Sequence, residues 1–299
     1  MRRLAFLLGF LAAAAVRASE HPLVLQTDFG LKDGAVAAMR GVAAGVNPRL
    51  MVHDLSHENT PFDIWEAAYR LRQVAPFWPE GTVFVSVVDP GVGTGRKSIV
   101  LKTRSGHFFV TPDNGTLTLV AEELGIAAVR EIDETKNRRR GSERSHTFHG
   151  RDVYVYVGAR LAAGVIAFED VGPLRPPAVV TLAYERPRRE RDALVGTIPF
   201  LDFQFGNVWT NLDESLFAAL QPKAGERFRV TIAHGGKAVF TGDMPYARTF
   251  GDVPEGEPLL YLNSLMNVAL ALNQGDFAKK HAVASGADWS VRIERAPSR

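Results

Sequence analysis

The chain has 299 residues, enough for one large domain or two ordinary ones, and its 46% hydrophobic and 23% charged residues are typical of a soluble globular protein. A formal net charge of +2 is too small to favour nucleic acid as a partner. The absence of cysteine excludes disulfides, thiolate catalysis and cysteine-ligated metals.

The first residues follow the layout of a secretory signal peptide. A short basic start precedes an apolar run over residues 4–16, and Val16 and Ala18 are the small side chains expected before a cleavage site. The run is shorter than the ~20 residues that a bilayer span needs. We therefore expect residues 1–18 to be removed, leaving a periplasmic or secreted chain that starts at Ser19 and has no stable membrane span. An uncleaved N-terminal anchor and a misassigned start, which would leave the protein cytoplasmic, are the alternatives.

Residues 19–172 alternate between strand-like and helix-like patterns. Such alternation, with acidic and Gly-rich turns between the elements, is typical of a wound α/β sheet. Strands are expected over residues 23–26, 50–52, 83–88, 98–103 and 107–110, and helices over 35–44, from Pro61 to about 71, 117–123 and 153–163, with a polar loop over 134–145. We predict an α/β N-terminal domain with a central, mostly parallel sheet.

The composition changes after residue 172. Prolines and a charged stretch over residues 173–192 are typical of a linker. The following segments are strand-like and separated by regular turns: 193–200, 228–233, 237–240, 258–262 and 289–294. We predict a smaller C-terminal antiparallel β domain over residues 193–299.

The stretch over residues 83–96 carries the strongest local signal for a ligand site. A buried strand ends in Asp89, and a turn with three glycines leads to Arg96. Open α/β sheets place ligands at the carboxyl ends of their strands. A structural ion pair across the turn is the alternative to an active pair.

Four further groups of residues have both a functional and a structural interpretation. Asp28 and Asp33 suit a ribose diol or an ammonium group, or they cap a helix. His149 precedes a helix, where it can exchange a proton with a ligand or serve only the fold. Residues 202–211 combine aromatic and amide side chains that can stack on a base and read its edge, or form a packed β-hairpin. A metal site remains an alternative for one set of residues: His53, Asp54, His57, His146, His149 and Asp152.

Six short motifs follow one another in order along most of the chain. They are Thr27-Asp28-Phe29-Gly30, Val88-Asp89-Pro90-Gly91-Val92-Gly93-Thr94, Pro112-Asp113-Asn114-Gly115, Thr147-Phe148-His149-Gly150-Arg151-Asp152, Phe205-Gly206-Asn207-Val208-Trp209-Thr210-Asn211 and Asn263-Ser264. Together they resemble the S-adenosylmethionine hydroxide adenosyltransferases, relatives of the fluorinase and chlorinase. The resemblance implies a homotrimer that binds its small-molecule substrate between the N-terminal domain of one subunit and the C-terminal domain of the next.

The same resemblance implies roles for individual residues. Asp89, Arg96 and His149 match a triad that activates water. The substrate contacts that it implies are Asp28 at the ribose diol, Phe62 against the ribose, Asp33 and Asp202 at the methionine ammonium, Asn207 at adenine, Trp209 in the pocket wall and Ser264 at the methionine carboxylate. No cofactor and no metal are expected, because S-adenosylmethionine would be the substrate.

The resemblance implies hydrolysis of S-adenosylmethionine to adenosine and methionine, by in-line attack of activated water at ribose C5′. The similar halogenases hold Tyr and Thr in place of Asp89 and Val92, and the fluorinase holds Ser in place of Gly150, so the hydroxyl donors for a halide are missing here. Met266 and Ala269 replace a Gly and a Glu common in such families. Two other functions stay open: an exported adenosyl- or nucleoside-binding protein without turnover, and a metal-dependent hydrolase.

Overall fold

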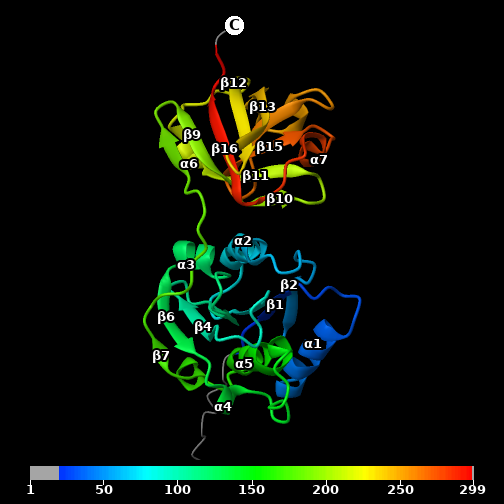
Figure 1. The fold of residues 1–299 in the computed structure, drawn as a ribbon, viewed down its shortest axis with the longest axis vertical. Helices are drawn as coiled ribbons and strands as arrows, with labels where there is room; N and C mark the ends of the chain where they lie inside the picture. Colours follow the sequence, from blue (N-terminus) through cyan, green and yellow to red (C-terminus); the bar gives the residue numbers. More distant parts are fainter. Residues whose placement is uncertain (1–19, 298–299) are drawn as a thin grey trace, which may run out of the picture.

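The computed structural model describes residues 20–297, which form two lobes connected by the segment that follows β7 (Figure 1). The signal peptide expected at residues 1–18 lies outside the described residues. Within residues 20–297, no helix combines the length and the apolar character needed to cross a membrane.

The N-terminal lobe is built on one seven-stranded sheet. Its strands are, in spatial order, β2 (Val52–Ser56), β1 (Leu23–Thr27), β3 (Val83–Val87), β5 (Phe108–Pro112), β4 (Ser98–Thr103), β6 (Ile126–Glu131) and β7 (Leu174–Arg175). Parallel pairing joins β2, β1, β3 and β5, whereas β4 and β7 run opposite to the other five strands. The predicted α/β domain with a mostly parallel central sheet is confirmed.

Helices cover both faces of this sheet. Successive residues of a strand point to opposite sides, so neighbouring residues pack against different helices. Leu23 of β1 faces the cluster that contains residues of α1 (Ala35–Val46) and α5 (Val155–Ala162). Its neighbour Val24 faces the cluster that contains Leu71 of α2 (Ile64–Val74) and Val120 of α3 (Thr118–Leu124). A short helix, α4 (Glu134–Asn137), precedes the π-helical turn Gly150–Tyr154 that leads into α5.

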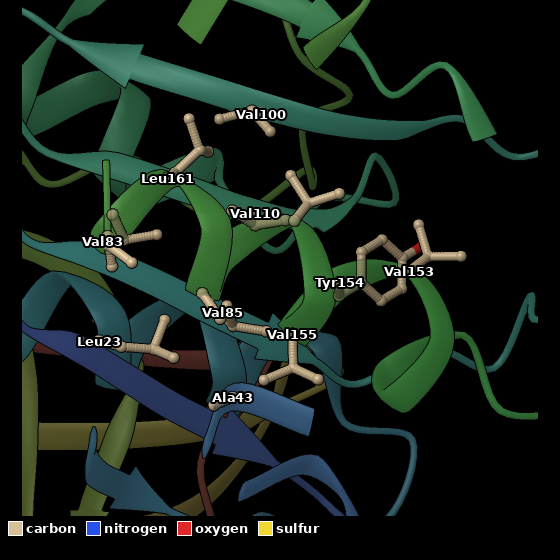
Figure 2. Close-up of a cluster of buried hydrophobic side chains, with 14 of the residues drawn as sticks. Leu23, Ala43, Val83, Val85, Val100, Val110, Val153, Tyr154, Val155 and Leu161 are labelled. Carbon is tan, nitrogen blue, oxygen red and sulfur yellow. The ribbon is translucent and has the colours of Figure 1, made fainter. Parts of the chain in front are cut away.

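Close approach of α5 to the sheet depends on Gly158. Figure 2 shows Val155 and Leu161 of α5 packed among apolar side chains of the strands. A Cβ on Gly158 would lie 2.4 Å from Cγ2 of Val85, a distance that the packing cannot accept without movement. We expect Gly158→Ala to lower the free energy of unfolding by about 1–3 kcal/mol through overpacking. Chemical denaturation would measure the loss, and Gly41→Ala, a helical position with open space around it, is the matched control that should not be destabilised.

The C-terminal lobe is a sandwich of two antiparallel sheets. One has the order β10 (Phe200–Asp202), β11 (Asn207–Asp213), β15 (Asn267–Leu272) and β14 (Pro258–Leu262), and the other has the order β13 (Lys237–Pro245), β12 (Arg227–His234), β16 (Gly286–Arg295), β9 (Ala193–Ile198) and β8 (Arg188–Glu190). Side chains of both sheets share one buried cluster with the short helices α6 (Glu214–Ala218) and α7 (Phe277–His281). The predicted antiparallel β domain is confirmed.

Contacts between the lobes run through α2. Nε1 of Trp65 donates to the carbonyl of Pro199 at 3.0 Å, and the ring of Tyr69 stacks on Phe200 with centroids 5.0 Å apart. Aromatic pairs of this kind contribute beyond the area that they bury. This α2 contact therefore helps to hold the C-terminal lobe against the N-terminal one.

Several predicted boundaries are wrong. The second strand, predicted at 50–52, begins two residues later and ends four residues later, so His53 and Asp54 lie within β2 rather than after it. The second helix starts at Ile64 rather than Pro61, because Asp63 caps it by accepting from the amide of Glu66 at 2.8 Å. The polar stretch 134–145 contains α4, and the expected linker 173–192 contributes β7 and β8. The 202–211 stretch lies in the β10–β11 hairpin, which was one of its two interpretations, and this pairing does not decide whether it binds a ligand.

Candidate active site

A tight turn after β3 returns the chain to the carboxylate that ends the strand. The amide of Val92 donates to the carbonyl of Asp89 at 3.2 Å, and Gly93 has φ +78°, in the region that favours glycine. A Cβ on Gly91 would lie 3.3 Å from Cγ of Arg96, so the small residue leaves room for the arginine to fold back. The Gly-rich turn therefore brings Arg96 to Asp89.

Asp89, Arg96 and His149 lie in direct contact. Nε of Arg96 donates to the two oxygens of Asp89 at 3.0 and 3.1 Å, and Nη2 donates to Oδ2 at 2.5 Å. The same Nη2 lies 3.0 Å from Nδ1 of His149. The side chains of Asp89 and Arg96 are 5% and 10% exposed, so each charge depends on the other for compensation.

A buried polar layer holds the guanidinium from behind. Nη1 of Arg96 donates to Oγ of Ser98 at 2.9 Å, and that hydroxyl lies 3.1 Å from the hydroxyl of Tyr154. The guanidinium also lies 5.6 Å from the centre of the Tyr154 ring. Burial raises the pKa of Tyr154, which therefore stays neutral. Burial opposes the charge of Arg96, but the hydrogen bond to Asp89 and the nearby acidic groups together outweigh it, and the net effect raises the pKa of Arg96.

His149 occupies the position just before the π-helical turn, with a defined tautomer. Because a guanidinium has only donors, Nδ1 accepts from Arg96 and the neutral ring carries its proton on Nε2. Burial, assisted by the positive charge of Arg96, lowers the pKa of His149 below its usual range. Within residues 20–297, Nε2 has no hydrogen-bond partner. The ring of His149 lines the adjoining cavity, whereas Nε2 itself is a buried donor that is left unsatisfied.

That cavity, the N-terminal pocket, has a volume of about 310 Å³. Its polar lining groups include the carboxylates of Asp28 and Asp89 and the imidazole of His149. The complete lining is Asp28, Phe29, Pro61, Phe62, Val87, Asp89, Val92, Thr147, Phe148, His149 and Gly150. Arg96 is not part of it and lies behind Asp89 and His149. The pocket thus combines two carboxylates and an imidazole in a largely apolar wall, which suits a water molecule beside an organic ligand.

Two of the other predicted residues frame this pocket. Oδ2 of Asp28 accepts from the amide of Phe62 at 2.9 Å, and Phe62 is 69% exposed with φ +68°. Asp33 does not line the pocket: its Oδ1 accepts from the amide of Ala35 at 2.8 Å, at the start of α1. The N-cap of α1 is Gly34, so Asp33 satisfies the first amide of the helix from the position before the cap.

A second cavity, the C-terminal pocket, has a volume of about 780 Å³ and shares no lining residue with the first. It gathers the four predicted residues of that domain, Asp202, Asn207, Trp209 and Ser264. Nδ2 of Asn207 donates to Oδ2 of Asp202 at 3.1 Å. The β10–β11 hairpin thus places an amide, a carboxylate and an indole on one concave surface.

The two unusual residues near Ser264 are accommodated by the local structure. Oδ1 of Asn263 accepts from the amides of Leu265 and Asn267, both at 3.0 Å, and closes the turn. Met266 has φ +57° and is 47% exposed, so it adopts the left-handed conformation that glycine would take more easily, at a cost of about 1–2 kcal/mol. Ala269 is fully buried on β15.

The prediction missed several lining residues. Phe29 and Phe148 line the N-terminal pocket and meet edge to face, with centroids 5.8 Å apart. Phe29 follows Asp28 and Phe148 precedes His149, and both of these neighbours were candidate site residues. An aromatic residue next to a candidate site residue is the signal that could have identified the two phenylalanines. Tyr261, Phe250 and the backbone around Gln274 line the C-terminal pocket and carried no local signal.

The six His and Asp residues considered for a metal do not converge. His57 pairs with Asp54, Asp152 pairs with Arg151, and His149 pairs with Arg96. Across the described residues, no group of three His, Asp or Glu side chains is arranged to hold a metal ion.

Comparison with known proteins adds independent findings. The model of the SAM hydroxide adenosyltransferase N-terminal domain matches residues 23–172, and that of the C-terminal domain matches residues 196–290. An (R)-S-adenosyl-L-methionine hydrolase of Salinispora tropica is 38% identical over 87% of this chain and 93% of its own length. A fluorinase of Actinoplanes sp. is 29% identical over 92% of this chain and 98% of its own. A crystal structure of an uncharacterized conserved protein from Thermotoga maritima superposes with a TM-score of 0.84 at 36% identity, covering 91% of this chain and all of the other.

Proposed function

The chain belongs to the SAM hydroxide adenosyltransferase family, and on this premise we propose that it hydrolyses S-adenosylmethionine to adenosine and methionine. The contact of Asp89, Arg96 and His149 beside the N-terminal pocket carries the proposal. The relatives named as (R)-S-adenosyl-L-methionine hydrolases support it, because they align with most of the chain.

The leaving group needs no acid to protonate it. The sulfonium already leaves as a neutral thioether, so the difficult partner is water, whose bulk pKa is about 15.7. We propose that Asp89 accepts a proton from a water molecule whose oxygen receives the Nε2–H of His149. The water oxygen bonds to C5′, the C5′–S bond breaks in line, and its electron pair returns to sulfur. The products are adenosine and methionine, and the proton ends on Asp89.

Arg96 has a different part in this proposal. Its donors are directed at Asp89, His149 and Ser98, and it does not line the pocket. It therefore orients the carboxylate, fixes the tautomer of His149 and places a positive charge behind developing hydroxide. Preorganised charge of this kind needs no rearrangement during the reaction.

The remaining residues are assigned to the substrate. Asp28 would accept from the ribose diol, with Phe62 against the sugar, and Asn207 and Trp209 would receive adenine. Asp33 and Asp202 would hold the methionine ammonium, and Ser264 the methionine carboxylate. Because Asp28 and Phe62 line one pocket and the assigned residues of the C-terminal lobe line another that shares no residue with it, we propose a homotrimer in which the N-terminal pocket of one subunit faces the C-terminal pocket of the next.

Incubation of the purified protein with S-adenosylmethionine tests the proposal directly. Adenosine and methionine should form at equal rates, unchanged by chloride and by a chelator. Asp89 and Val92 line the pocket, where the carboxylate of Asp89 repels a halide and Val92 offers no hydroxyl to replace its water shell. Formation of 5′-chloro-5′-deoxyadenosine would instead show halogenation, binding without adenosine would show a binding protein, and loss with the chelator would show a metal hydrolase.

The rate should depend on pH through His149. Since the pKa of His149 is lowered by burial and by Arg96, the ring is neutral at pH 7 and becomes charged only below its usual value of about 6.5. Protonation would destroy the Nδ1 acceptor for Arg96, so kcat/KM should fall on the acid side and reach a plateau near neutrality. A pH–rate profile measures this, and in His149→Asn the acid limb should disappear from the much lower residual rate. An unchanged limb in that variant would contradict the assignment.

A further inference from the structure

His57 is a fully enclosed histidine that the proposed mechanism does not use. Its side chain is 1% exposed, and both ring nitrogens have partners. Nδ1 lies 2.8 Å from Oγ1 of Thr27 at the end of β1, and Nε2 lies 3.0 Å from Oδ1 of Asp54 in β2. Asp54 in turn receives a hydrogen bond from Arg40 of α1. These contacts connect α1, the strands β1 and β2, and the loop that follows β2, where His57 lies.

The hydrogen bonds from Thr27 through His57 to Asp54 can all be given the same direction. Burial opposes the charge of Asp54, but the hydrogen bonds from His57 and Arg40 outweigh it and lower the pKa of Asp54, which is therefore a carboxylate that accepts from Nε2–H. Oγ1 of Thr27 accepts from the amide of Phe29 at 3.2 Å. Among the described residues, Nδ1 of His57 is the one acceptor that the structure gives the buried Thr27 hydroxyl, so we assign the hydroxyl proton to that contact, which corresponds to a neutral ring protonated on Nε2.

The same residue joins the two loops that frame the N-terminal pocket. The carbonyl of His57 accepts from the amide of Gly30 at 2.7 Å, and the amide of Phe62 donates to Asp28 at 2.9 Å. Thr27, the partner of the His57 ring, directly precedes Asp28. The loop with Asp28 is thus attached to the loop with Phe62 by the His57 backbone, by the His57 ring and by Asp28 itself.

We propose that His57 is a positioning residue, which acts through Thr27 to hold Asp28 and Phe29 in the orientation that receives the ribose. This role rests on the proposed function, because it presumes an adenosyl substrate in the N-terminal pocket. Neither His57 nor Thr27 lines that pocket, so the effect passes through the 27–30 loop and not through direct contact.

Replacing the Thr27 hydroxyl tests the role in the full-length enzyme. Thr27→Val keeps the shape but removes both hydrogen bonds, and the KM for S-adenosylmethionine should rise about tenfold with a smaller change in kcat. Thr27→Ser restores the hydroxyl and should restore KM. Thr103→Val is the control: Thr103 is also buried and its hydroxyl also donates and accepts, but in the β4–β5 turn, so its KM should not change.

The ring itself gives a readout that does not depend on turnover. In the ¹⁵N spectrum of the wild-type protein at pH 7, Nε2 of His57 should be protonated and Nδ1 should not. The opposite tautomer, an unchanged KM in Thr27→Val, or a Thr27→Ser variant that fails to regain wild-type KM would each overturn the positioning role alone. A wild-type protein that binds but forms no adenosine would overturn the proposed function and this role with it.

Discussion

Asp89→Asn should reduce kcat by about 10²–10⁴-fold, the range expected when a general base is lost, with a smaller change in the affinity for S-adenosylmethionine. The amide keeps the size of the side chain and removes its charge and its basicity. Because Asp89 lines the N-terminal pocket beside the free N–H of His149, the loss should appear in the chemical step. Single-turnover kinetics measure that step, and calorimetric titration measures binding.

The same change also removes the counter-charge of a guanidinium that is only 10% exposed. Breaking a buried pair on one side costs about 3–5 kcal/mol, so the variant is expected to be less stable as well as slow. The double variant Asp89→Asn/Arg96→Met removes both charges and should regain much of the stability while remaining inactive. Return of activity together with stability would show that the pair serves only the fold.

A more exposed ion pair provides a control for the Asp-to-Asn change itself. Asp243 receives two hydrogen bonds from Arg229 at 2.9 and 3.1 Å in the C-terminal lobe, with side chains 25% and 38% exposed. Asp243→Asn also removes a carboxylate from a guanidinium, but far from the N-terminal pocket along the chain. Its kcat should equal that of the wild type. A loss comparable to that of Asp89→Asn would mean that the assay reports stability rather than catalysis.

The strands that carry the site could be predicted because their sequences are unambiguous. β1 and β3 are short apolar runs that end in acidic, Gly-rich turns, and each of their residues is buried. Asp89 and Arg96 are seven positions apart, so local spacing already joined them. His149 lies 53 positions beyond Arg96, and no periodicity connects the two. Only the family resemblance placed it in the same site.

The missed strands have physical reasons. β6 and β15 include alanines among their apolar residues and few β-branched ones, so neither shows strand propensity, although all six residues of β15 are buried. β2 is an edge strand whose polar residues, such as His53 and Asp54, point partly to solvent. Its pairing with β1, not its own composition, fixes its register. The proposed role of His57 could not be predicted for the same reason, because its hydrogen-bond partners lie on β1 and β2.

The residues assigned to the substrate are divided between two pockets. Asp28 and Asp89 line one pocket, whereas Asp202, Asn207 and Ser264 line another, and one ligand that uses both sets would need the two pockets to face each other. In a closed ring of identical subunits, an N-terminal pocket can face the C-terminal pocket of its neighbour throughout. Two inactive variants with defects in different pockets should therefore complement each other.

Co-expression of Asp89→Asn with Asp202→Ala/Asn207→Ala tests this arrangement. Each variant alone should have almost no activity, but random assembly in equal amounts pairs an intact N-terminal pocket with an intact C-terminal pocket at about one quarter of the interfaces. Every mixed trimer that carries both affinity tags has one such interface out of three, so these trimers should recover about one third of the wild-type kcat per chain. If each site were formed within one chain, no mixed oligomer would contain an intact site, and activity would stay at the level of the variants. Recovery near one third would therefore place each reaction between two subunits.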